Sequence, residues 1–130
     1  MAELIFIYNA KSGVTNALFD WAHKIISPNT YECNLCTITY NNLGKEKKWR
    51  EFLENINIES RFYYIDHLKN LHFVKSPSEL PCIYLKKDKN VTLIIDSDEL
   101  NSFNNVNELI EKLKNYLIKY DKTNSKIDHN

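Results

Sequence analysis

Long apolar runs and an excess of either charge are both missing from this 130-residue chain. No window approaches the roughly 18 apolar residues of a transmembrane helix, and the opening run over residues 4–8 lacks the basic flank of a signal peptide. Lys plus Arg and Asp plus Glu number 17 each. The charge balance gives no case for a nucleic-acid or anionic-membrane partner. We therefore expect a cytoplasmic protein with neither kind of partner.

Cysteine is scarce as well. Three cysteines are present, and an odd number argues against a framework of structural disulfides. Two of them form a CxxC pair in the segment Tyr31-Glu32-Cys33-Asn34-Leu35-Cys36. In the cytoplasm, where thiols are usually reduced, such a pair is more often catalytic or metal-binding than structural.

The chain also lacks internal repeats and low-complexity linkers that would divide it. Its length and its 43% hydrophobic content suit one globular domain with a core of its own. We predict a single domain over residues 1–120. Residues 121–130 are polar and are expected to form a frayed tail.

Apolar periodicity and turn residues predict the order of the elements. Strands are expected over 4–8, 61–66, 82–86 and 91–96. Helices are expected over 14–26, 45–56 and from Asn105 or Asn107 to about Tyr120. The CxxC segment is expected in a loop or short strand, residues 41–44 and 87–90 in turns, and residues 98–105 in a loop. A βα start favours a parallel strand pair and a late hairpin requires an antiparallel one, so we predict an α/β fold with a mixed four-stranded sheet flanked by helices on both faces.

The second half of the chain resembles the thioredoxin-like superfamily, of which the whole would be a divergent member. The resemblance is carried by Phe62-Tyr63-Tyr64-Ile65-Asp66, by Leu80-Pro81-Cys82-Ile83-Tyr84-Leu85, by the turn over 87–90, by Val91-Thr92-Leu93-Ile94-Ile95 and by the closing helix. In that family a proline opens the hairpin beside the active site. The resemblance therefore implies a thioredoxin-like fold and a cis Leu80–Pro81 bond, with Pro81 as a supporting residue.

The position of the CxxC departs from the family pattern. Active thioredoxins carry the pair at the end of the first strand, whereas here Tyr8-Asn9-Ala10-Lys11-Ser12 occupies that place. The pair follows the first predicted helix, within an insertion over about residues 27–60. The segment Ser27-Pro28-Asn29-Thr30-Tyr31-Glu32-Cys33-Asn34-Leu35-Cys36 also resembles one in small bacterial proteins of unknown function, and this similarity implies no activity.

A redox interpretation makes Cys33 and Cys36 a dithiol that cycles to a disulfide with a protein or small-thiol partner and no cofactor. Cys33 would be the attacking thiol, because Cys36 precedes an apolar stretch and should be more buried. Asp20 and His23, three residues apart on the first predicted helix, would lie on one side of it as supporting residues.

A metal-binding interpretation uses the same pair as thiolate ligands for Zn or Cu. A structural zinc site usually takes four ligands, and no second CxxC exists, so His23 together with Cys82 or a carboxylate would complete the set. Each also has a simpler interpretation: His23 as a helix-end histidine and Cys82 as a core strand residue. The two cysteines themselves can also be buried as small apolar side chains.

Other classes of function find less support. Residues 9–13 precede a predicted helix and could bind an anion through free N–H groups, but the GxxxxGK[ST] pattern of a P-loop is absent. His67 and His72 fall in an irregular stretch and are expected to be solvated. A non-catalytic interaction domain that keeps only the scaffold is the remaining alternative.

Overall fold

A computed structural model describes residues 2–10, 33–41, 44–76 and 79–128, and the account below concerns these residues. The elements are β1 (Ala2–Ile7), α2 (Asn34–Thr39), β2 (Tyr40–Asn41), β3 (Gly44–Lys45), α3 (Lys47–Asn55), β4 (Glu59–Tyr63), the 3-10 helix η1 (Ile65–Asn70), β5 (Cys82–Lys87), β6 (Asn90–Ile95), α4 (Ser97–Ser102) and α5 (Val106–Asp128). The predicted helix over 14–26 lies outside the described residues.

The central sheet has four strands in the order β4-β1-β5-β6. Strand β1 pairs in parallel with β4 and antiparallel with β5, which in turn pairs antiparallel with β6. The β5–β6 hairpin turns at Asp88, whose φ of 56° is in the left-handed region that Asp tolerates better than most residues. The predicted mixed four-stranded sheet is confirmed. A separate two-stranded pairing joins β2 to β3.

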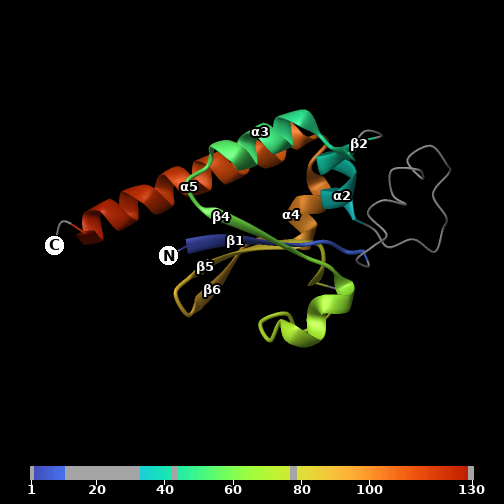
Figure 1. Cartoon of the computed structure of the whole chain (residues 1–130), viewed down its shortest axis with the longest axis horizontal. Coiled ribbons are helices and arrows are strands. Elements are labelled where there is room, and N and C mark those ends of the chain that lie inside the picture. The colour runs from blue at the N-terminus through green and yellow to red at the C-terminus, as the bar shows by residue number, and fades with distance from the viewer. Residues whose placement is uncertain (1, 11–32, 42–43, 77–78, 129–130) are drawn as a thin grey trace.

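Side chains of β1 and β5 alternate between two core clusters, because successive strand residues point to opposite faces of a sheet. We call the first the helix-side core; its strand members include Leu4, Phe6, Tyr8, Ile83 and Leu85. The second, the η1-side core, comprises Ile5, Ile7, Leu71, Val74, Leu80, Cys82 and Tyr84. Figure 1 shows α3 and α5 above the sheet and η1 below it. The sheet is therefore flanked by helical segments on both faces, as predicted.

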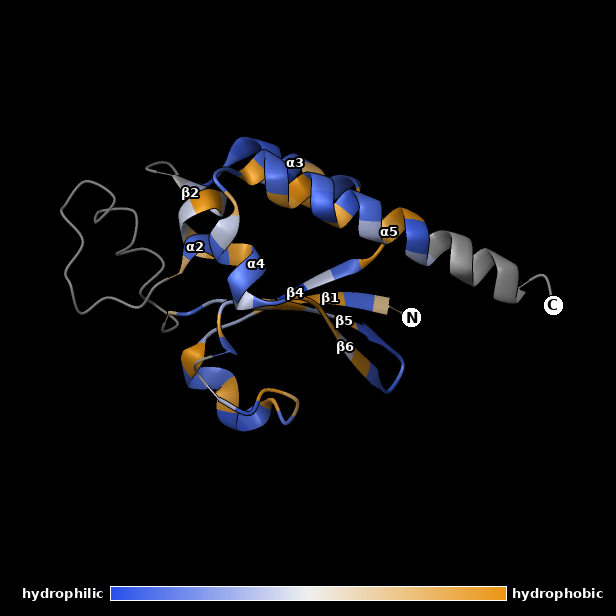
Figure 2. Ribbon diagram, turned by 180° about the vertical axis from the view of Figure 1, so that it is seen from behind, coloured by the Kyte–Doolittle hydropathy of each residue, from blue (hydrophilic) through white to orange (hydrophobic). Residues whose placement is uncertain are grey.

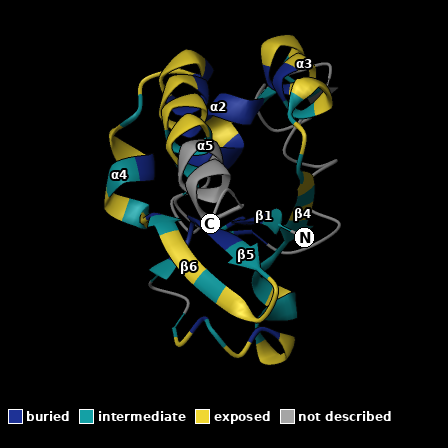
Figure 3. Ribbon diagram, turned by 90° about the vertical axis from the view of Figure 1, so that its left-hand side faces the viewer, coloured by how far each residue is buried: buried dark blue, intermediate teal, exposed yellow. Residues whose placement is uncertain are grey.

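Helix α5 covers the helix-side core. Its buried residues Val106, Leu109, Ile110 and Leu113 recur at the i, i+3, i+4, i+7 spacing of one helical face. Figure 2 shows apolar and polar residues alternating around the helix, and Figure 3 shows its buried side facing inward. The Glu108 N–H donates to Asn105 Oδ1 at 3.1 Å, so Asn105 marks the start of α5 as predicted. None of the described helices combines the length and apolar character needed to span a bilayer.

Four segments differ from the sequence-based prediction. Residues 34–39 form helix α2 and not a loop or strand, and residues 97–102 form helix α4 within the predicted loop. Strand β4 starts and ends earlier than predicted, at Glu59 and Tyr63, because the backbone turns into η1 at Ile65. Helix α5 continues to Asp128, through the stretch predicted to be frayed.

Candidate functional site

Cys33 and Cys36 form a disulfide across the first turn of α2, with their Cα atoms 5.3 Å apart. Cys33 is the N-cap residue of the helix and Cys36 lies on its buried face. Cys36 is 6% exposed, whereas Cys33 is half-buried at the edge of the helix-side core. The predicted difference in burial between the two cysteines is confirmed. Cys33 is therefore the more accessible of the two residues.

At the start of α2, a backbone N–H group points at the sulfur of Cys33. The Cys36 N–H donates to Cys33 Sγ at 3.2 Å, so the sulfur occupies the place of a capping side chain oxygen. The Cys33 carbonyl oxygen accepts from the Thr37 N–H at 3.1 Å and from Thr37 Oγ1 at 3.2 Å. These contacts give Cys33 a fixed position relative to the helix.

Helix α2 is attached to α4 through Asn34. The Asn34 Nδ2 group donates to the Leu100 carbonyl oxygen at 2.7 Å and to the Phe103 carbonyl oxygen at 2.8 Å. These carbonyls lie at the C-terminal end of α4, where Phe103 is the cap residue. Sequence reasoning missed this contact, because the partners are 66 and 69 residues apart and lie in a helix that was not predicted.

The buried face of α2 packs into the helix-side core through Leu35, Cys36 and Ile38. The same cluster contains Tyr8 and Ala10, which follow directly after β1. Figure 1 shows α2 on the helix side of the sheet, near the end where β1 finishes. The two cysteines follow β1 by about 26 residues in sequence, yet they pack in the same core cluster as the residues at the end of that strand.

Tyr8 beneath α2 is uncharged at neutral pH. Burial raises the pKa of its hydroxyl well above the ordinary value, and the neighbouring Tyr40 raises it further. The rings of these two tyrosines meet edge to face with centroids 6.0 Å apart. The core beneath the disulfide thus receives no negative charge from Tyr8.

Pro81 lies at the start of β5, and its bond to Leu80 is cis, as the family resemblance implied. The next residue, Cys82, is the register partner of Ile7 at the end of β1. Pro81 itself is buried. It belongs to the end of the sheet where β1 finishes.

Cys82 is separated from the other two cysteines by the sheet. It is 1% exposed and belongs to the η1-side core, whereas Cys36 belongs to the helix-side core. Burial raises the pKa of its thiol from 9.0 to about 12, and Glu79 adds to the shift while a hydrogen bond with Tyr84 opposes it. The structure does not bring Cys82 together with Cys33 and Cys36 as the four-ligand metal set that includes Cys82 requires.

Potential metal ligands do not gather elsewhere in the described residues, where no group of three or more His, Cys, Asp or Glu side chains could hold an ion. Asp20 and His23 lie outside the described residues. His67 was expected to be solvated, but the structure shows it in contact with its neighbours. Its Nδ1 accepts from the Tyr64 N–H at 3.0 Å, and its ring contacts Tyr63 and Tyr64. His72 is exposed, as expected.

Residues 9–13 are described only as far as Ala10. Ala10 is buried, and its carbonyl oxygen accepts from the Ile65 N–H at 2.9 Å. This end of the segment over residues 9–13 is therefore held against the start of η1.

A groove of 560 Å³ lies between α3 and α5, away from the disulfide. None of its lining residues belongs to α2 or α4, so it does not open onto Cys33. It is lined by Lys48, Glu51, Phe52, Asn55, Ile56, Asn57, Ile58, Asn107, Ile110, Lys114, Leu117 and Ile118.

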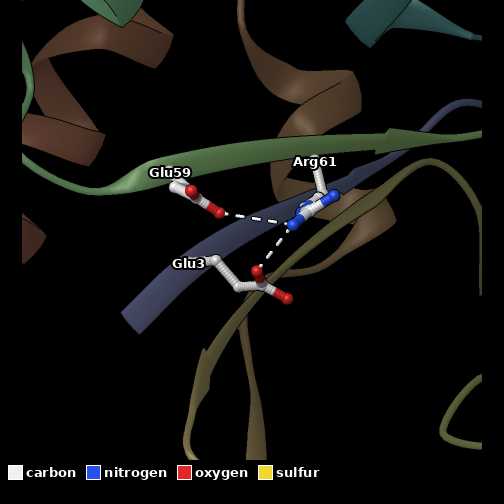
Figure 4. Close-up of polar contacts among 3 residues, drawn as sticks. All are labelled: Glu3, Glu59 and Arg61. Carbon is white, nitrogen blue, oxygen red and sulfur yellow. Dashed lines mark hydrogen bonds and ion pairs between the residues drawn. The ribbon is translucent and has the colours of Figure 1, made fainter. Parts of the chain in front are cut away.

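Charged side chains meet on the edge strand β4 and its neighbour β1. Glu3 and Glu59 are register partners on the parallel strands β1 and β4, and Arg61 lies between their carboxylates (Figure 4). Its Nε is 3.3 Å from Glu3 Oε2, and a terminal nitrogen is 3.4 Å from Glu59 Oε2. The hydrogen bond with Glu3 is the main reason that the pKa of Arg61 is raised. Because the guanidinium is exposed, this cluster offsets repulsion between two like charges and is no candidate for catalysis.

Comparisons of the chain with protein-family models, curated proteins and solved structures return no match. The function is therefore argued from the geometry of the Cys33–Cys36 pair.

Proposed function

We propose that this chain is a thiol–disulfide exchange protein of thioredoxin-like architecture, with Cys33 as the nucleophile and Cys36 as the resolving thiol. The observation that carries the proposal is the disulfide across the first turn of α2, in which Cys33 is the accessible partner and Cys36 is 6% exposed. A purely structural disulfide would gain nothing from this asymmetry, whereas an exchange reaction requires one reachable sulfur and one protected sulfur.

The proposed reaction begins from the dithiol form. The Cys33 thiolate attacks one sulfur of a partner disulfide, a new S–S bond forms, and the partner's other sulfur leaves as a thiolate that takes up a proton. The Cys36 sulfur then loses its proton and attacks Cys33 Sγ, which releases the second partner thiol. Two electrons pass from the dithiol to the partner disulfide, and a small-thiol or protein dithiol reductant reverses the sequence.

The Cys36 N–H is the group that supports the nucleophile. It lies 3.2 Å from Cys33 Sγ and donates to it. A hydrogen bond to the charged form of a group favours that form, so the same N–H would stabilise the Cys33 thiolate when the disulfide opens. The donor belongs to the resolving residue, so the two sulfurs stay within reach of one another throughout the cycle.

The fold gives independent support to the thioredoxin-like part of the proposal. A parallel β1–β4 pair, an antiparallel β5–β6 hairpin preceded by Pro81, and the closing helix α5 reproduce the order that the sequence shares with that superfamily. The proposal retains the cytoplasmic location predicted from the sequence, where disulfides are usually transient and catalytic or sensing. Its partner is a protein or a small thiol.

The test is to trap the mixed disulfide. Reduced Cys36→Ser protein is incubated with oxidised glutathione, and the adduct at Cys33 is measured by intact mass. We expect it to accumulate in Cys36→Ser and to be much weaker in Cys33→Ser, where the two remaining cysteines, Cys36 and Cys82, are both buried. A Cys82→Ala protein, with both exchange cysteines present, should pass to the Cys33–Cys36 disulfide without accumulating an adduct.

Two results would overturn the proposal. Near-stoichiometric Zn or Cu in the reduced protein, lost from the Cys33→Ser/Cys36→Ser variant, would assign the pair to metal binding. Absence of an adduct and of metal in every variant would leave a non-catalytic interaction domain.

A further inference from the structure

The contact between Asn34 and α4 has a consequence for the redox equilibrium of the neighbouring cysteines. Asn34 is the first residue of α2 and stands between the two cysteines in the sequence. Its side chain amide donates to two carbonyl oxygens of a different helix, at 2.7 and 2.8 Å. The Leu100 carbonyl oxygen also accepts from the Phe103 N–H at 3.4 Å, so Asn34 adds a second, closer donor at this helix end.

The acceptor side of this contact is firmly held. Leu100 is fully buried in the helix-side core, and Phe103 packs against the same core. Lys112 on α5 forms a 3.0 Å ion pair with Glu99, which joins α4 to the longest helix. Figures 1 and 2 both show α2 beside α4. The start of α2 is therefore attached to a platform that belongs to the rest of the fold.

Helix α2 has only six residues. A helix far shorter than about 12 residues is not stable by itself in water, so its first turn depends on tertiary contacts. Three restraints act on this turn: the Cys33–Cys36 disulfide, the amide of Asn34, and the burial of Leu35 and Cys36 in the helix-side core. In the oxidised protein all three are present. After reduction the buried side chains and the contact with α4 remain, and the contact with α4 is the polar restraint that joins a residue between the two cysteines to another helix.

We infer that Asn34 is a positioning residue that holds the two thiols of the reduced protein in the geometry of the disulfide. This inference rests on the proposed exchange function. Closing a disulfide between positioned thiols orders little chain, whereas closing it from an unwound turn must order that turn as well. Asn34 therefore stabilises the disulfide relative to the dithiol, although it contacts neither sulfur.

The inference is tested by the equilibrium constant of the Cys33–Cys36 pair in glutathione redox buffers. Loss of the two amide hydrogen bonds of Asn34 corresponds to roughly a tenfold change in this equilibrium constant. We expect Asn34→Leu, which keeps the branched shape without a donor, to weaken the disulfide about tenfold, or about 30 mV towards a more oxidising potential. Asn34→Ala should shift the equilibrium constant in the same direction, and it replaces Asn34→Leu in the test if the leucine variant does not fold.

A matched control is Asn55→Ala. The Asn55 Nδ2 group donates to the Glu51 carbonyl oxygen at 2.7 Å on the exposed side of α3. Its loss removes the same type of hydrogen bond away from the disulfide and should leave the equilibrium constant unchanged. Urea unfolding of the oxidised and reduced forms supplies the second readout. Folding and disulfide formation are linked in one thermodynamic cycle, so a variant with a weaker native disulfide must lose more stability in the oxidised form than in the reduced form, and this is the result expected for the Asn34 variants.

The two failures are distinguishable. If wild-type Cys33–Cys36 does not exchange with glutathione at all, the proposed function fails and this inference fails with it. If the wild type exchanges and Asn34→Leu or Asn34→Ala has the wild-type constant, with equal stability losses in both redox forms, then Asn34 is merely structural and the inference alone is overturned.

Discussion

Cys36 and Cys82 are both buried, yet they lie in core clusters on opposite faces of the central sheet. The strand alternation that places Ile83 in the helix-side core directs Cys82 to the other side. The third cysteine is therefore isolated from the disulfide chemistry in the folded protein.

The first prediction concerns the number of reactive thiols. In the unreduced native protein, Cys82 should not react with an aromatic disulfide reagent, because it is 1% exposed and burial raises its pKa to about 12. In guanidinium the same sample should release one equivalent, and a Cys82→Ala sample none. A rapid full equivalent from the native protein would contradict this placement.

Reduction of the Cys33–Cys36 disulfide should weaken the fold only moderately. The bond closes a loop of cysteines three positions apart, and the chain-entropy relation gives about 2 kcal/mol for so short a loop. Urea unfolding curves with and without a reductant should differ by about that amount. The Cys33→Ser/Cys36→Ser variant should not respond to the reductant. Loss of the cooperative transition on reduction would show that the disulfide holds the whole domain together.

The packing of α5 predicts a strong contrast between two leucines. Leu113 is fully buried in the helix-side core, whereas Leu93 on β6 is 48% exposed. We expect Leu113→Ala to lower the free energy of unfolding by about 2–5 kcal/mol, because it leaves a cavity. Leu93→Ala should cost much less, within about 1 kcal/mol. Similar losses from both variants in urea unfolding would contradict the assignment of α5 as the main cover of the sheet.

Local sequence patterns predict the strands and helices in which several buried residues recur at the spacing of the element. Strand β1 was visible as a continuous apolar run, and α5 as an apolar stripe that begins at Val106. Helix α4 was not visible because Leu100 is its only buried residue. The one signal was Asp96, whose side chain accepts from the Glu99 N–H at 2.9 Å and caps the helix. An Asp followed three residues later by Glu is a pattern typical of helix starts, and it was present in the sequence.

At the site, the sequence predicts the pair of cysteines and not its surroundings. The CxxC spacing indicated which two sulfurs pair, but the residues after it, Thr37-Ile38-Thr39-Tyr40, have the β-branched and aromatic character of a strand. Tertiary contacts override that preference: Ile38 and Thr39 are buried, and Asn34 is attached to α4. Contacts across 66 residues of sequence have no local signature, so the surroundings of the disulfide could not be derived from the spacing.

The last prediction is a loss of stability at alkaline pH that depends on Cys82. Burial raises the pKa of its thiol from 9.0 to about 12. Between these values the folded protein keeps the proton while the unfolded chain has lost it. The unfolded state then binds fewer protons, so the free energy of unfolding falls as pH rises, by up to about 1.4 kcal/mol per pH unit. Below pH 9 the contribution is fully present.

Wild type and Cys82→Ala, both with the Cys33–Cys36 disulfide intact, should be compared by urea unfolding from about pH 8 to about pH 11. The disulfide cysteines do not titrate, and Tyr8, whose pKa is also raised, ionises equally in the two proteins. Tyr84 is coupled to the thiol, because Cys82 is one of the causes that raise the pKa of Tyr84. The difference between the two slopes therefore reports Cys82 together with its effect on Tyr84. The wild-type curve should fall more steeply above pH 9, and parallel curves across the whole range would mean that the thiol is hydrated in the folded state.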